Sequence, residues 1–147
     1  MSNSHDYEAW VDGSFKKGLP SFGLMIYQLE EGESSLVYHD CGVLPADGSR
    51  QIAGEIEATI LAIMWAREYH RKESNVKMKI YHDYMGLQAW PLRAWKANDR
   101  NAKRLVNIFD RAIAQGIEIT FQHVKGHTGI QRNELVDKLA ASAFDNI

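Results

Sequence analysis

At 147 residues, of which 45% are hydrophobic, the chain is long enough for one domain with a substantial core and too short for two ordinary ones. Its single cysteine, Cys41, excludes an internal disulfide and a zinc site built from cysteines. The formal net charge of -2 argues mildly against a nucleic-acid partner unless basic residues cluster. No segment reaches the roughly 20 apolar residues of a membrane span, and no secretion signal opens the chain. We therefore expect residues 1–147 to form a single cytoplasmic domain with no membrane association.

The first third of the chain predicts three antiparallel strands. Residues 7–17, 21–30 and 33–43 are rich in β-branched and aromatic side chains, and breaks that contain glycine separate them. Residues 51–72 then predict a long helix, because four isoleucines recur there at helical spacing: Ile52, Ile56, Ile60 and Ile63. The chain thus opens with a β-meander that leads into a helix.

A short strand and a helix breaker follow in the middle of the chain. Residues 77–82 alternate apolar and polar side chains, which predicts a strand. Any helix that begins near Met85 ends at Trp90-Pro91, because proline cannot continue it.

The last third predicts a helix over 101–115, a strand over 117–124 and a final helix over 131–144. The final helix is expected to place five apolar residues on one face: Leu135, Val136, Leu139, Ala140 and Ala143. Three hairpin-linked strands followed by alternating strands and helices favour an α/β fold. We expect a mixed five-stranded sheet, with three antiparallel strands, parallel additions and helices on both faces.

Basic residues concentrate between positions 90 and 111. Six of them are set against only two acids in this segment: Arg93, Lys96, Arg100, Lys103, Arg104 and Arg111 against Asp99 and Asp110. This local excess of +4 leaves -6 for the rest of the chain, and it is typical of a surface that binds an anionic partner. A solvated amphipathic helix would have the same pattern.

Two strands carry an acid where burial of a charge is costly. Asp12 lies in the first strand and Asp83 ends the fourth. On the 51–72 helix, Glu55 falls on the flank of the isoleucine stripe, whereas Glu57 points away from it and is expected to be solvated.

The last helix offers a further acid, Asp137, at the border of its apolar face. Asn133 lies one turn earlier and points the same way. If the strands and helices bring the four carboxylates together, their repulsion calls for a hard divalent cation with oxygen ligands, and Mg²⁺ is the natural candidate. The alternative is that each acid is an isolated surface residue or part of a salt bridge.

Four blocks of sequence occur in one order with suitable spacings. They are Val11-Asp12-Gly13-Ser14, Gly54-Glu55-Ile56-Glu57-Ala58, Ile80-Tyr81-His82-Asp83-Tyr84, and Val124-Lys125-Gly126-His127-Thr128-Gly129 with Asn133-Glu134-Leu135-Val136-Asp137-Lys138-Leu139-Ala140. Together they resemble ribonuclease H type 1 from about residue 7 to the C-terminus. Tyr84 and the Trp95-Lys96-Ala97-Asn98 segment are most similar to a bacterial subgroup that often carries an N-terminal viroplasmin-like domain, which we do not expect among these residues.

The resemblance implies a ribonuclease H-like fold and an endonuclease that hydrolyses the RNA strand of RNA/DNA hybrids. It implies two-metal-ion catalysis that leaves 5′-phosphate and 3′-hydroxyl ends. The family's four metal-binding acids fall on Asp12, Glu55, Asp83 and Asp137, which would hold two Mg²⁺ ions, with Mn²⁺ as a substitute. His127 falls on the family's mobile-loop histidine, and we expect it to act in proton transfer or product release. The alternative is a loop histidine that makes a local hydrogen bond.

Substrate contacts are expected on two surfaces, because the 2′-hydroxyls of the RNA strand distinguish a hybrid from duplex DNA and its deoxy strand distinguishes it from duplex RNA. The candidates are Gly13, Ser14 and Gln51 for the RNA strand, Trp95, Lys96 and Arg100 for the DNA strand, and Asn133 beside the acids. Gln51 stands where the family usually has Asn. Trp90 and Trp95 could equally be core residues, and for Trp90 a place in the core is favoured.

Two rival functions share part of this pattern. A non-catalytic module that binds hybrids would keep the fold, but the four acids and His127 argue against it. Another nuclease of the same superfold, such as a junction resolvase or an exonuclease, would share the acids and lack the His127 loop. We expect the protein to be a monomer.

Overall fold

The computed structural model describes residues 5–70, 75–126 and 129–146. The elements follow the predicted order, and a final 3₁₀ turn is added. They are β1 (His5–Lys16), β2 (Leu19–Glu30), β3 (Glu33–Val43), α1 (Gln51–His70), β4 (Val76–His82), α2 (Gly86–Ala89), α3 (Arg100–Ala114), β5 (Glu118–His123), α4 (Gln131–Ser142) and η1 (Ala143–Asn146). The break at Trp90-Pro91 is confirmed, because α2 is a single turn that ends at Ala89.

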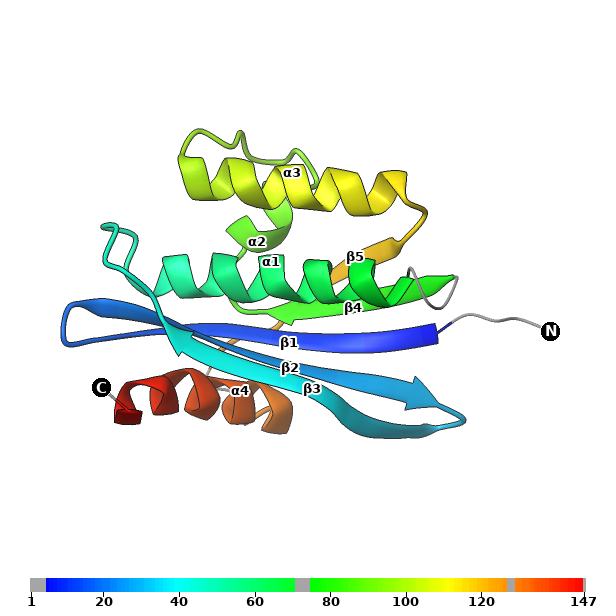
Figure 1. The fold of residues 1–147 in the computed structure, drawn as a ribbon, viewed down its shortest axis with the longest axis horizontal. Helices are drawn as coiled ribbons and strands as arrows, with labels where there is room; N and C mark the ends of the chain where they lie inside the picture. The colour runs from blue at the N-terminus through cyan, green and yellow to red at the C-terminus, as the bar shows by residue number, and fades with distance from the viewer. Residues whose placement is uncertain (1–4, 71–74, 127–128, 147) are drawn as a thin grey trace.

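The five strands form one mixed sheet in the order β3-β2-β1-β4-β5. The pairs β1–β2 and β2–β3 are antiparallel, and β1–β4 and β4–β5 are parallel. Helices α1 and α3 lie on one side of the sheet and α4 lies on the other (Figure 1). The predicted mixed sheet with helices on both faces is therefore confirmed.

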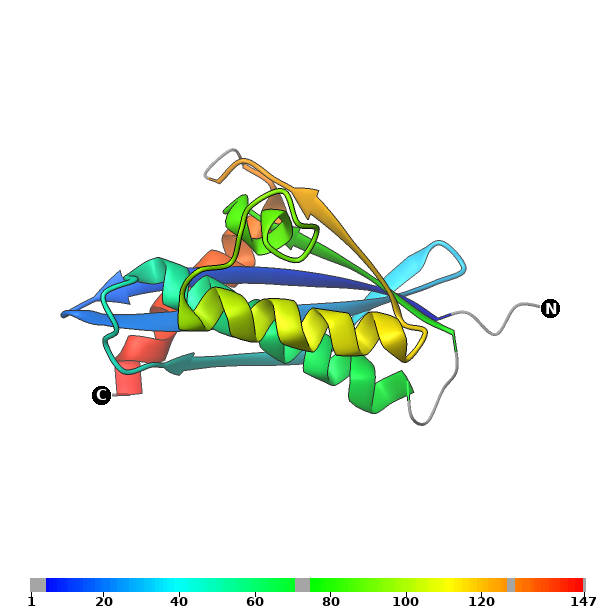
Figure 2. The same cartoon turned by 90° about the horizontal axis from the view of Figure 1, so that it is seen from above.

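The main core lies between the sheet and α1. Ile56, Ile60 and Ile63 of α1 are buried there, as their spacing predicts, against strand residues such as Leu24 and Ile80. Seen from above, α3 runs alongside α1 as a second helix over the same face (Figure 2). Asp99 starts α3, because its side chain accepts a hydrogen bond from the Ala102 backbone N–H at 2.8 Å. A smaller cluster on the opposite face includes Trp10, Tyr27, Val124 and Val136.

The prediction that Leu135 shares one packed apolar face of α4 is wrong, since 41% of this residue is exposed. The helix instead buries Val136, Ala140 and Asn133. Its orientation is set by Gly23 of β2, where a Cβ would lie 2.8 Å from both the Ala140 nitrogen and the Val136 oxygen. The stripe that includes Val136 and Ala140 must therefore lie flat on the sheet, which turns Leu135 outward.

Within the described ranges, none of the helices is both long enough and apolar enough to cross a membrane.

Candidate active site

Three carboxylates meet at the point where β1 and β4 separate. The parallel pairing of these strands ends at Trp10 and Tyr81, two residues before Asp12 and Asp83. Asp12, Asp83 and Glu55 each offer an oxygen, and these atoms lie within 4.8 Å of one another. The predicted convergence is therefore confirmed for these three acids.

Close packing of α1 on β1 delivers Glu55 to this point. A Cβ on Gly13 would lie 2.2 Å from the Gln51 carbonyl oxygen and 2.8 Å from the Glu55 nitrogen, so only glycine allows this approach. Glu57, by contrast, is half-buried and lies 3.5 Å from the Arg104 guanidinium. The helical phase thus distinguished the two glutamates correctly, although Glu57 contacts a basic residue as well as solvent.

Helix α4 brings two polar residues to the opposite side of the same small cleft. Asp137 and Asn133 line this cleft together with Asp12 and Asp83. Asn133 is 4% exposed, and its Oδ1 atom has no hydrogen-bond partner among the described residues. A buried amide oxygen without a partner is costly, and a cation or a substrate donor in the cleft would satisfy it.

The pKa values of Asp12 and Glu55 are raised because both residues are buried and lie close to Asp83. Burial, followed by the charge of Asp83, raises the pKa of Asp12 to about 8, and Asp137 adds to the shift. Burial, again followed by the charge of Asp83, raises the pKa of Glu55 to about 10. The Gly13 N–H donates to Asp12 Oδ1 at 2.8 Å and opposes the shift of Asp12 without cancelling it.

These residues fit a hard divalent cation. The donors are carboxylate oxygens and one amide oxygen, the ligand type that Mg²⁺ and Mn²⁺ prefer over nitrogen or sulfur. A cation would oppose the raised pKa values of Asp12 and Glu55, because its charge favours the ionised carboxylates.

Two histidines that sequence reasoning did not select lie beside Asp83, one of them buried and the other exposed. His82 is completely buried, with Nδ1 3.0 Å from the Tyr84 carbonyl oxygen and Nε2 2.8 Å from the Gln88 amide. Burial lowers the pKa of His82, which favours the neutral ring over the charged one. His123 Nε2 lies 3.1 Å from the Asp83 carbonyl oxygen. The alternation Met78, Ile80, His82 could have signalled the burial of His82.

Comparison with known proteins decides the family. The family model described as RNase H matches residues 4–145. The chain belongs to the ribonuclease H family.

Individual relatives of this family agree with the assignment. A ribonuclease H of Rhodopirellula baltica is 35% identical over 65 residues, which cover 40% of this chain and 40% of that protein. The chain spans about 40% of the length of the curated relatives it matches.

Two solved structures share the ribonuclease H fold. The RNase H1 of the halophilic archaeon Halobacterium salinarum has a TM-score of 0.72 at 18% identity, over 97% of this chain and 99% of that one. LC11-RNase H1, solved in complex with an RNA/DNA hybrid, has a TM-score of 0.73 at 13% identity, over 95% and 97% of the two chains. The predicted resemblance to ribonuclease H type 1 is confirmed.

In this ribonuclease H family member, His127 follows β5 in the sequence and lies outside the described residues. Gly126, the residue before it, lines the acidic cleft and lies against Asp83. The role predicted for His127 stays a prediction.

The candidate RNA-strand residues lie next to the acids. Gly13 and Ser14 directly follow Asp12 on β1 and are half-buried, and Gln51 is the exposed first residue of α1. The close approach of Gly13 to the Gln51 carbonyl brings the start of α1 against β1 beside Asp12. Gly13 also allows α1 to pack closely on β1. The sequence predicted only substrate binding for this residue.

The candidate DNA-strand residues form a separate surface. Trp95 is 45% exposed, and its ring centroid lies 6.0 Å from Trp90 and 6.2 Å from Tyr84. Trp90 is half-buried against the main core, as expected, and Lys96 is exposed beside Trp95.

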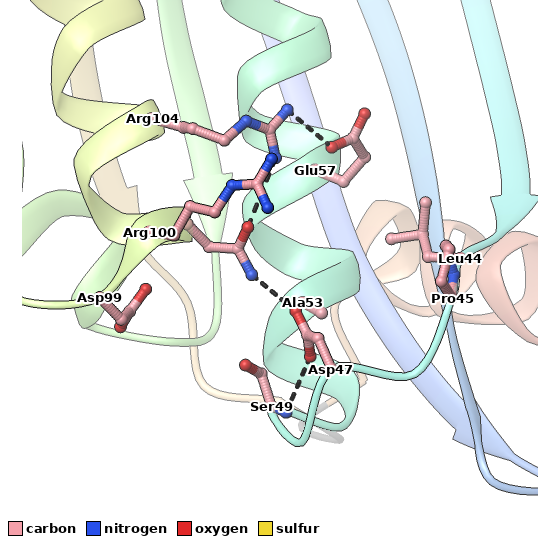
Figure 3. Close-up of a pocket in the computed structure, with 10 residues that line it drawn as sticks. Leu44, Pro45, Asp47, Ser49, Ala53, Glu57, Asp99, Arg100 and Arg104 are labelled. Carbon is pink, nitrogen blue, oxygen red and sulfur yellow. Dashed lines mark hydrogen bonds and ion pairs between the residues drawn. The ribbon is translucent and has the colours of Figure 1, made fainter.

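Arg100 lines a separate cavity of about 480 Å³ between the start of α1 and the start of α3 (Figure 3). The same cavity contains Asp47, whose carboxylate accepts from Asn101 Nδ2 at 2.6 Å and from the Ser49 backbone N–H at 2.8 Å. These hydrogen bonds lower the pKa of Asp47. The cavity is therefore mixed in charge.

Part of the basic excess is neutralised within the protein. Arg93 Nη2 donates to both carboxylate oxygens of Asp110, at 2.9 Å and 2.7 Å, and Arg104 contacts Glu57. Lys96, Arg100 and Lys103 are exposed and have no ion pair with another described residue. The surface available to phosphates is thus smaller than the sequence count indicates.

Proposed function

We propose that this protein is a metal-dependent endonuclease that hydrolyses the RNA strand of RNA/DNA hybrids. The observation that carries the proposal is the meeting of Asp12, Glu55 and Asp83 within 4.8 Å in a member of the ribonuclease H family. The similarity to LC11-RNase H1, which was solved with an RNA/DNA hybrid, supports the choice of substrate. We further propose that residues 1–147 act as one catalytic domain, monomeric and cytoplasmic.

The cation would be held by the carboxylates of Asp12, Glu55, Asp83 and Asp137. Two Mg²⁺ ions, or Mn²⁺ in their place, would supply Lewis-acid catalysis of in-line phosphodiester hydrolysis, which leaves 5′-phosphate and 3′-hydroxyl ends. Asp12 lies between α1 and α4, and the Gly13 N–H fixes one of its oxygens. Asp12 is therefore the carboxylate best placed to bind a cation together with Glu55 of α1 on one side and Asp137 of α4 on the other.

The remaining residues would bind and orient the hybrid. Gly13, Ser14 and Gln51 would contact the RNA strand beside the acids, and Asn133 would donate or accept within the cleft. Trp95, Lys96 and Arg100, none of which lines the acidic cleft, would bind the DNA strand. His127 would transfer a proton or assist product release.

The test is hydrolysis of four labelled substrates: an RNA/DNA hybrid, duplex DNA, duplex RNA and a four-way junction. Each is incubated with Mg²⁺ and with a chelator. We expect cleavage of the RNA strand of the hybrid alone, and only with Mg²⁺. Binding of the hybrid without cleavage would indicate the non-catalytic module, and cleavage of the junction or of duplex DNA would indicate another nuclease of the superfold.

A further inference from the structure

One arginine side chain joins the first turn of α4 to three strands. Arg132 Nη1 donates to Glu8 Oε1 on β1 at 2.8 Å. Its guanidinium carbon lies 3.8 Å above the centre of the Tyr27 ring on β2, and Nη2 donates to the Ser34 hydroxyl on β3. Arginine can make these contacts together because its planar group stacks and donates at the same time.

Glu8 extends this network to a fourth strand. The carboxylate also accepts from Trp10 Nε1 at 3.2 Å, and the Trp10 ring stacks on Tyr81 of β4 at 4.2 Å with an angle of 4° between the rings. Trp10 and Tyr81 are two residues before Asp12 and Asp83 on the same strands. The network therefore lies directly beside the acidic cleft.

Local capping does little to fix the start of α4. Ile130 occupies the N-cap position and makes no side-chain cap hydrogen bond, and Gly129 before it has a φ of 84°. Further along, the helix is held by the Ser21 hydroxyl, which donates to the Ala140 carbonyl at 2.6 Å. Arg132 is thus the side chain that ties the first turn to the sheet.

We propose that Arg132 is a positioning residue that fixes the first turn of α4 and so holds Asn133 and Asp137 toward Asp12 and Asp83. Asn133 is the next residue in the chain, and Asp137 lies one turn beyond it on the same side of the helix. The inference rests on the proposed function for its meaning in catalysis. The Arg132 and Glu8 side chains are only 28% and 18% exposed, so their ion pair is better shielded from solvent than one at the surface.

The experiment compares Arg132→Ala with the parent protein in two assays without substrate. The first is Mn²⁺ binding by calorimetry, and the second is amide hydrogen exchange over residues 131–137 without metal. We expect Arg132→Ala to weaken Mn²⁺ binding by about 10- to 100-fold, the scale for groups that orient metal ligands. Exchange at residues 134–137, whose amides donate back to the first turn as the Glu134 N–H does to the Ile130 carbonyl, should rise at least about tenfold, because this turn would open locally.

Three further variants make the test specific. Arg67→Ala removes a hydrogen bond of 2.6 Å to Gln115 that joins α1 to α3, far from α4, and should change neither measurement. Arg132→Lys keeps the positive charge but loses the planar guanidinium that stacks on Tyr27, and should recover part of the Mn²⁺ affinity. Glu8→Gln weakens the network from β1 and carries the test if Arg132→Ala does not fold.

Metal binding and exchange that match the parent in folded Arg132→Ala, or equal losses in Arg67→Ala, would overturn the inference. Hydrolysis is measured separately: the Mg²⁺ concentration for half-maximal rate should rise, and the KM for the hybrid should rise as well because Asn133 moves with the helix. If the parent binds Mn²⁺ but cleaves no hybrid, the proposed function fails while the two substrate-free assays still decide the role of Arg132.

Discussion

Asp12 of β1 is the direct antiparallel partner of Gly23 of β2. The carboxylate and the missing side chain occupy the same face of the sheet, so the glycine lets α4 rest against the sheet beside the acid. The distance of α4 from the acidic cleft is thus set by a residue that has no functional group.

Gly23→Ala should therefore impair both folding and activity. Its Cβ would lie 2.8 Å from two backbone atoms of α4, and relief of this overlap should cost about 1–3 kcal/mol in the free energy of unfolding. Urea denaturation measures this cost, and hydrolysis should fall because Asp137 moves with the helix. The control is Ala141→Ser on the exposed side of α4, which should change neither quantity. A Gly23→Ala protein with the stability and activity of the parent would contradict the packing argument.

Asp83→Asn should keep the fold and reduce hydrolysis of the hybrid by several orders of magnitude, because a neutral amide is a poor ligand for Mg²⁺. Binding of the hybrid in Ca²⁺ should survive better than turnover. Glu57→Gln, on the same helix as Glu55 but outside the cluster, is the matched control and should stay within about tenfold of the parent. A similarly active Asp83→Asn protein would rule out the assignment of this acid as a metal ligand.

Asp12→Asn should stabilise the metal-free protein at alkaline pH. The folded state holds the Asp12 proton up to a pKa of about 8, whereas the unfolded state releases it near the ordinary value of 3.8. Raising the pH through this window therefore favours unfolding, and the loss is complete above pH 8. With a chelator at pH 8, the Tm of Asp12→Asn should exceed that of the parent by at least about 3 °C.

The same pair of proteins has a built-in control at acid pH. At pH 4 the Asp12 carboxyl of the parent is protonated in the folded protein, so the difference in Tm should nearly vanish. Addition of Mg²⁺ at pH 8 should raise the Tm of the parent more than that of Asp12→Asn. Equal Tm values at both pH values would show that the buried carboxyl carries no such penalty.

Replacement of both Lys96 and Arg100 by alanine should flatten the dependence of hybrid binding on salt. Each lost phosphate contact lowers the slope of log affinity against log salt by roughly 0.7 to 0.9. The KM should rise and the maximal rate should change little, because these residues lie away from the acids. Arg93→Ala is the control, since Arg93 is already paired with Asp110 and should alter the slope less. Equal slopes for the double variant and the parent would show that Lys96 and Arg100 contact no phosphate and that the basic segment is only solvated.

His127→Ala should slow turnover by roughly 10- to 1000-fold, the range of a proton-transfer group, and leave Mn²⁺ binding by calorimetry intact. A rate profile measured from pH 6 to 9 distinguishes the alternatives. An unchanged profile would indicate that the histidine makes only a local hydrogen bond.

Patterns along the chain predicted what depends on spacing. The alternation of strand residues and the phase of Glu55 on its helix identified the three acids, because both depend only on backbone geometry. Contacts between distant segments have no such signal. Nothing near Arg132 in the sequence points to Glu8, 124 residues away, or indicates that Arg93 pairs with Asp110. The outward turn of Leu135 was missed for the same reason, since a glycine on β2 selects the buried face of α4.

Asp12 and Gly13 lie on opposite faces of the sheet: the Asp12 side chain is on the face that α4 covers, and Gly13 packs against α1. Side chains alternate along a strand with a period of two, so the number of β1 residues before Asp12 decides which face of the sheet its carboxylate occupies. Insertion or deletion of one residue between 6 and 11 would exchange the two positions. The Asp12 carboxylate would then be pressed against α1, where Gly13 now lies next to Glu55. The Lys17-Gly18 turn lies past the dipeptide and escapes this rule. Variation in chain length should therefore be tolerated at that hairpin and lethal to catalysis a few residues upstream.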